Sequence, residues 1–197
     1  MAPVDMVRCF NVLTYFDSAF RRKAARWAAR TLRAGGLFIC GSDGAQTMDA
    51  RYTVYRREAA GLIAREFAFS IENLRPLLTH PWFALHDGDR EVLSVATLVA
   101  ILRADDRFRT SYDKRTDALL AEKRLLVRGA DGHLAPPPDS LPESGWIAAR
   151  EEIAVQLERE GFADQAVTVL RRVGLNAWVN PVGHVAVDPA GIAPRFD

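Results

Sequence analysis

The chain has 197 residues, of which 49% are hydrophobic and 26% are charged, and its formal net charge is +1. This composition is typical of a globular protein with one medium domain or two small ones, and it excludes a disordered or fibrous chain. Because 26 Lys and Arg residues oppose 25 Asp and Glu residues, no overall field attracts nucleic acid or an anionic membrane.

The cysteines and the apolar runs point to the reducing cytoplasm. Cys9 and Cys40 are the only cysteines, each lies in a short apolar run, and no CxxC pattern surrounds either. No apolar stretch reaches the roughly 18 to 20 residues that a membrane span needs, and no export signal follows Met1. The histidines lack a second ligand at helical spacing, so we expect no metal site. They are His80, His86, His133 and His184.

The first 40 residues have a strand, helix, strand order. Asp5 to Phe10 and Leu37 to Cys40 are short apolar runs suited to a parallel sheet. The segment between them predicts a helix that begins after Asp17 or Ser18, either of which can cap it, and that ends at Gly35.

Apolar residues recur on this helix at a spacing that predicts one face packed on the sheet. They are Phe20, Ala24, Trp27, Ala28, Thr31 and Leu32. The other positions are mostly basic, which we interpret as a solvated outer face rather than a nucleic-acid surface. They are Arg21, Arg22, Lys23, Arg26, Arg30 and Arg33.

The next segment, RYTVYRREAAGLIAREFAFS, predicts two strands joined around residues 59–61. After about Pro76 helical patterns take over, and a hairpin turning at Pro181 to Gly183 closes the chain. The expected helices are Arg90 to Arg103, Asp106 to Arg124, Trp146 to Glu160 and Ala163 to Arg172. We therefore predict an α/β protein, with a partial Rossmann-like sheet in residues 1–76 and a mainly helical accessory domain with a C-terminal β-hairpin in residues 77–197.

Helix 106–124 is followed by LLVRGADGHL, in which Asp131 and Gly132 form a good hairpin turn, and together they look like a winged helix. Acidic residues balance the basic ones across this region, which argues against DNA binding. Dimerisation and covering a substrate are the alternatives that the sequence leaves open.

The segment VDMVRCFNVLTYFDSAFRRKAARWAARTLRAGGLFICGSD resembles the fourth strand, following helix and fifth strand of class I S-adenosylmethionine-dependent methyltransferases, most closely the chemotaxis-receptor type. That family ends its fourth strand in a Cys-Arg-Asn-Val-Leu run closed by Tyr and Phe. Phe10 replaces the arginine here. The residues at matching places are Cys9, Asn11, Val12, Leu13, Tyr15 and Phe16.

The resemblance implies that Phe10 and Asn11 contact the methionine part of S-adenosylmethionine and that Tyr15 lines the methyl-transfer pocket. The general rule that open α/β sheets bind ligands outside the carboxyl ends of their strands agrees with this placement. Two alternatives stay open. Asn11 can simply cap the turn after the strand, and Tyr15 can simply cover the core.

Two elements of the family pattern are absent from this sequence, namely the glycine-rich first βα turn and the acidic residue after the second strand. We therefore expect the chain to bind S-adenosylmethionine weakly unless a companion chain or a second copy completes the sheet. The expected activity is methyl transfer to an acceptor that the sequence does not identify, and no catalytic residue stands out. The alternative is a non-catalytic interaction or scaffold module.

Overall fold

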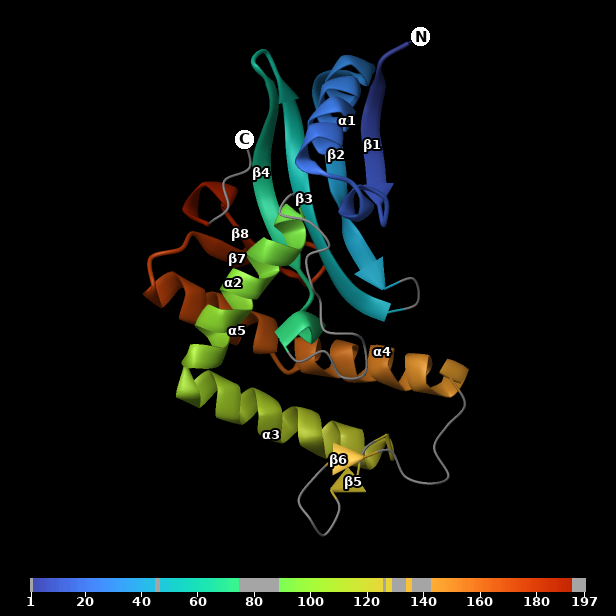
Figure 1. The fold of residues 1–197 in the computed structure, drawn as a ribbon. Helices are drawn as coiled ribbons and strands as arrows, with labels where there is room; N and C mark the ends of the chain where they lie inside the picture. The colour runs from blue at the N-terminus through green and yellow to red at the C-terminus, as the bar shows by residue number, and fades with distance from the viewer. Residues whose placement is uncertain are drawn as a thin grey trace.

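The computed structural model describes residues 2–44, 47–74, 89–125, 127–128, 134–135 and 143–192. These residues form an α/β fold around a six-stranded mixed sheet in the order β1-β2-β3-β4-β8-β7 (Figure 1). Its strands are β1 (Val4–Phe10), β2 (Leu32–Gly44), β3 (Thr47–Glu58), β4 (Gly61–Phe69), β7 (Ala177–Val179) and β8 (Val185–Val187).

The predicted strand, helix, strand unit is confirmed. β1 and β2 are adjacent and parallel, with Cys9 opposite Cys40, and α1 (Ser18–Thr31) crosses between them. The Asp17 carboxylate caps α1 by accepting a hydrogen bond from the backbone N–H of Phe20 at 2.8 Å. A helical crossover is the usual way to join parallel neighbours, because they cannot be connected by a tight turn.

The predicted helix end at Gly35 is wrong, because α1 ends at Thr31 and β2 begins at once. Gly35 has a left-handed φ of 76°, but it lies inside β2, in the irregular stretch where Val4 pairs with Leu32 and Met6 with Leu37. A Cβ on Gly36 would lie 3.0 Å from the carbonyl oxygen of Asp5. The glycine pair therefore lets the two strands approach closely rather than capping the helix.

The predicted apolar face of α1 is also partly wrong. Phe20 and Trp27 are 42% and 53% exposed, whereas Ala28 is fully buried with Leu32 beside it. The helix instead turns Arg21 inward to an ion pair with Glu91 at the start of α2 (Arg90–Ala104). An unpaired carboxylate is costly to bury, so the Arg21–Glu91 pair favours this rotation of α1.

The predicted hairpin is confirmed, since β3 and β4 pair antiparallel from Glu58 opposite Gly61 to Arg51 opposite Phe69. A short 3-10 helix, η2 (Ile71–Leu74), follows β4.

The C-terminal hairpin also forms, with β7 and β8 on either side of residues 180–184. β8 pairs with β4, placing Phe67 opposite Val187, so this hairpin belongs to the same sheet as residues 4–69. The expected domain boundary near residue 77 lies outside the described residues.

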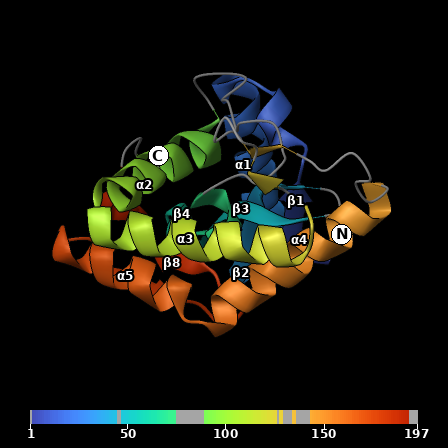
Figure 2. The ribbon, with the colours of Figure 1, turned by 90° about the horizontal axis from the view of Figure 1, so that it is seen from below.

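The helices after α2 are α3 (Asp106–Glu122), α4 (Glu143–Arg159) and α5 (Phe162–Arg172). Figure 2 shows α3 lying across α4 and α5 at one end of the sheet. Their apolar faces and those of α2, β4 and β8 share one core cluster, in which Tyr112 is fully buried and donates its hydroxyl to the Ile71 carbonyl at 3.0 Å. β5 (Val127–Arg128) and β6 (Leu134–Ala135) pair antiparallel as expected of a wing, and the Asp131–Gly132 turn lies outside the described residues.

β1 is an edge strand, because no other strand in the described ranges pairs with its outer side. Its Val4 and Met6 side chains are 36% and 51% exposed. A parallel strand is ordinarily buried on both faces. β1 instead combines an unpaired backbone edge with exposed apolar side chains.

Candidate functional site

The carboxyl end of β1 is closed by Asn11, which has a left-handed φ of 57° that asparagine tolerates better than most residues. Its backbone N–H donates to the Gly41 carbonyl at 3.0 Å and extends the pairing with β2. Its side-chain oxygen accepts from the Asp43 backbone N–H at 3.0 Å, and its amide donates to Oδ1 of Asp43 at 2.7 Å. Asn11 therefore ties the carboxyl ends of β1 and β2 together.

This arrangement supports the capping role of Asn11 and still leaves capacity for a ligand. An asparagine side chain has two amide hydrogens and two lone pairs. Within the described residues, Asn11 uses one amide hydrogen and one lone pair, both toward Asp43. The side chain thus keeps one donor and one acceptor.

The other two predicted site residues, Phe10 and Tyr15, lie before and after this turn in the chain. Cys9 packs against the α1 side of the sheet, so Phe10, the next residue of the strand, points to the opposite face. There its ring centroid lies 6.0 Å from that of Tyr52, and the Arg8 guanidinium stacks 4.4 Å above it. Tyr15 ends the short 3-10 helix η1 (Leu13–Tyr15) and is 62% exposed, so it does not cover the core.

Beside Phe10 lies a polar cluster that the sequence analysis did not predict. The Asn180 amide donates to the Tyr52 hydroxyl at 2.9 Å and to the Glu66 carboxylate at 2.8 Å. Nδ1 of His184 lies 3.3 Å from the same hydroxyl. These residues come from β3, β4 and the C-terminal turn, which lie far apart in sequence and share no motif.

The hydrogen bonds of Asn180 determine the proton positions in this cluster. Its side-chain oxygen accepts from the backbone N–H groups of Val182 and His184, at 3.2 and 3.1 Å, so its NH2 group faces Tyr52. The Tyr52 oxygen accepts from that NH2 group and can donate its own hydrogen to Nδ1 of His184. Burial lowers the pKa of His184 and raises that of Tyr52, which favours the neutral form of both.

On the other face of the sheet, beneath α1, lies a second polar cluster, centred on Glu91. Its side chain is 3% exposed and pairs with Arg21, whose side chain is 12% exposed. Thr53 and Cys40 donate to the same carboxylate at 3.2 and 3.5 Å. Burial, reinforced by the nearby Glu91 charge, raises the pKa of Cys40 well above its ordinary value, so this thiol stays protonated.

Close to this cluster, a pocket of about 310 Å³ lies between α1 and strands β2, β3 and β4. Its apolar lining is Leu13, Ala25, Ala29, Phe38, Tyr55 and Leu62. Arginines from α1 and the start of α2 complete it, namely Arg21, Arg22, Arg26 and Arg90. It lies on the face of the sheet opposite to Phe10, and none of the predicted cofactor residues Phe10, Asn11 and Tyr15 lines it.

Comparisons with known protein families, curated proteins and solved structures find no match for this chain. The described residues contain no group of three or more His, Cys, Asp or Glu side chains placed to hold a metal ion. Of the four histidines for which the sequence predicts no metal site, His80, His86 and His133 lie outside the described residues. No described helix is both long enough and apolar enough to cross a membrane.

Proposed function

We propose that this chain belongs to an S-adenosylmethionine-dependent methyltransferase, in which it forms the strands that bind the methionine end of the cofactor. The observation that carries the proposal is the parallel β1–α1–β2 unit whose first strand ends at Phe10 and Asn11. Ligands of open α/β sheets bind outside such strand ends. The resemblance of residues 4–43 to the methyltransferase family adds the identity of the cofactor.

The residues at this strand end suit only part of the cofactor. The spare donor and acceptor of Asn11 match the carboxylate and ammonium groups of a methionine tail, and the exposed Tyr15 can approach the methyl group. The described ranges contain no glycine-rich strand-to-helix turn for the adenosine end, since β1 matches the family's fourth strand and residues 11–17 between β1 and α1 include no glycine. We therefore assign no step of methyl transfer to residues of this chain.

The free edge of β1 supports the second part of the proposal, that a companion chain or a second copy pairs with β1 and completes the site. Exposed backbone groups beside Val4 and Met6 favour the addition of a strand. The same edge favours the alternative function, a non-catalytic interaction module that uses this fold only for pairing.

The test is a titration of the isotope-labelled chain with S-adenosylmethionine and, separately, with methionine, followed by NMR. We expect both ligands to shift the amide signals of residues 10–15 and 41–43, with millimolar affinity. Asn11→Gly keeps the left-handed turn but removes the amide, so it should weaken binding about fivefold or more. Asn176→Ala, at an exposed asparagine away from β1, is the matched control and should leave binding unchanged.

Absence of shifts at residues 10–15 would contradict the methyltransferase proposal and favour the interaction module. Micromolar affinity of the chain alone would contradict the need for a companion. Equal effects of the two asparagine substitutions would show that the shifts do not report binding at Asn11.

A further inference from the structure

The pocket beneath α1 exists because the helix turns small side chains toward the sheet. Ala25 and Ala29 line the pocket from above, while the bulky Trp27 points away and is 53% exposed. Phe38 and Leu62 of the sheet form the opposite wall. Alanine side chains are too short to fill the space between a helix and a sheet, so a gap of about 310 Å³ remains.

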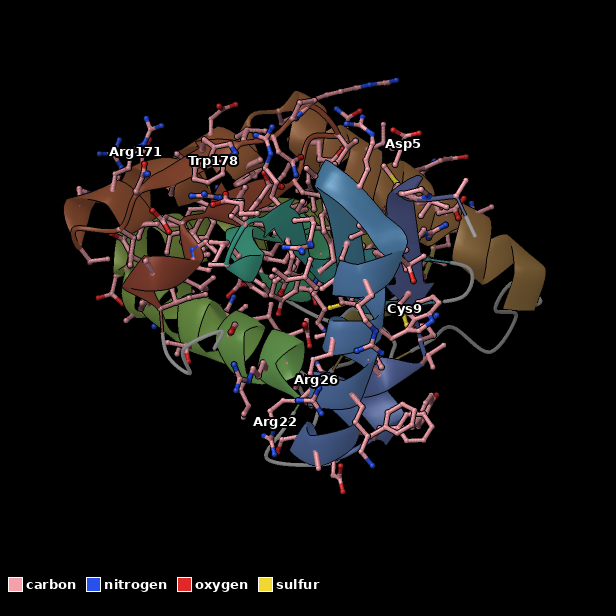
Figure 3. All side chains as sticks on the ribbon, turned by 90° about the horizontal axis from the view of Figure 1, so that it is seen from above. Asp5, Cys9, Arg22, Arg26, Arg171 and Trp178 are labelled. Carbon is pink, nitrogen blue, oxygen red and sulfur yellow. The ribbon has the colours of Figure 1, made fainter. Side chains whose placement is uncertain are left out.

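The charged residues that line this gap are all basic. Four arginines line the pocket, and none of the described lining residues is Asp or Glu. Arg21 is neutralised by Glu91, whereas Arg22 and Arg26 are exposed and form no ion pair with any residue that the structure describes. Figure 3 shows both of these side chains leaving α1 on the side where α2 lies.

We propose that this pocket binds a small amphiphilic carboxylate, with its apolar body against Phe38 and Leu62 and its carboxylate held by Arg22 and Arg26. A guanidinium group binds a carboxylate through two parallel hydrogen bonds, and an apolar pocket with few polar groups at its rim is the usual form of a small-molecule site. The volume is at the lower end of the range for such sites, which suits a ligand the size of a medium-chain fatty acid. The pocket shares no lining residue with the proposed cofactor site at the end of β1.

The charge requirement is tested with octanoate and the full chain, by calorimetric titration at low salt. The Arg22→Ala, Arg26→Ala double variant should bind octanoate about tenfold more weakly than the unmodified chain. Arg30→Ala is the matched control, because Arg30 is an exposed arginine of α1 that does not line the pocket, and its effect should stay within about twofold. Octanol, which has the same apolar body without the charge, should also bind about tenfold more weakly than octanoate.

The location is tested by filling the gap. Ala25→Leu should abolish octanoate binding and raise the melting temperature of the free protein, because the larger side chain occupies the space that the ligand would take. Octanoate should raise the melting temperature of the unmodified chain and not that of this variant. The proposal is overturned if octanoate fails to bind at several millimolar, if octanol binds as well as octanoate, or if Arg30→Ala weakens binding as much as the double variant. It is also overturned if Ala25→Leu folds and still binds octanoate normally.

Discussion

Replacing Arg21 with methionine removes the positive charge from the ion pair that orients α1 and keeps most of the aliphatic stem. Among the described residues, the buried Glu91 carboxylate would then keep the hydrogen bonds from Thr53 and Cys40 but lose its ion-pair partner. Breaking a buried ion pair by removing one partner costs about 3–5 kcal/mol, since the remaining charge stays desolvated. Arg21→Met should therefore lower the free energy of unfolding by about 3 kcal/mol or more.

The assay is urea unfolding followed by circular dichroism, with Arg22→Met as the matched control. Arg22 is exposed and has no ion-pair partner among the described residues, so its substitution should change the free energy of unfolding by about 0.5 kcal/mol or less. Removing both charges with Arg21→Met and Glu91→Met should cost clearly less than the sum of the two single substitutions. Additive costs, or a loss below about 1 kcal/mol for Arg21→Met, would refute the view that this pair orients α1.

Three further predictions concern the sheet and its ends. Gly41→Ala would place a Cβ against the Arg51 backbone carbonyl of β3, so it should cost about 3 kcal/mol in urea unfolding, and a cost below about 1 kcal/mol would contradict this. Burial lowers the folded-state pKa of His184 below 6.5, so the unfolded state binds more protons between the two values. Stability should therefore fall as the pH drops through that window, and His184→Gln should remove the slope in pH-dependent thermal unfolding. Sedimentation should show self-association through the β1 edge that Met6→Lys weakens, whereas a monomer at high concentration would show that the edge does not pair with a second copy.

The predictions that the structure confirms are those that depend on residues close together in the chain. The Asp17 cap, the β3–β4 hairpin and the parallel β1–β2 pair follow from residue types at short spacings, and all are present. The rotation of α1 could not be read from its own periodicity, because it depends on Arg21 meeting Glu91, 70 positions away. An apolar stripe shows which residues prefer burial, but it does not show which charge must be paired.

In the candidate site, too, the features set by near neighbours in the chain could be predicted and those set by distant residues could not. Its position at the end of β1 could be predicted from the order of strands and helix, and Asn11 lies there as expected. Its partner Asp43 is 32 positions away, and no local pattern links the two residues. The cluster of Tyr52 and His184 was missed for the same reason, since 132 positions separate them and each alone is an ordinary polar residue.

The pairing of β8 with β4 has a consequence for how the chain folds during synthesis. Tyr52 and Asn180, whose side chains form a hydrogen bond beside this part of the sheet, are separated by 128 positions. At roughly 5–20 residues per second, a ribosome takes about 6–25 s to make the intervening chain. During that time the β4 edge that β8 will cover is unpaired, and its apolar Phe67 and Phe69 lack part of their final surroundings. The nascent chain therefore has a long interval in which chaperone binding to β4 competes with aggregation, and the sheet is completed only when the last strands leave the ribosome.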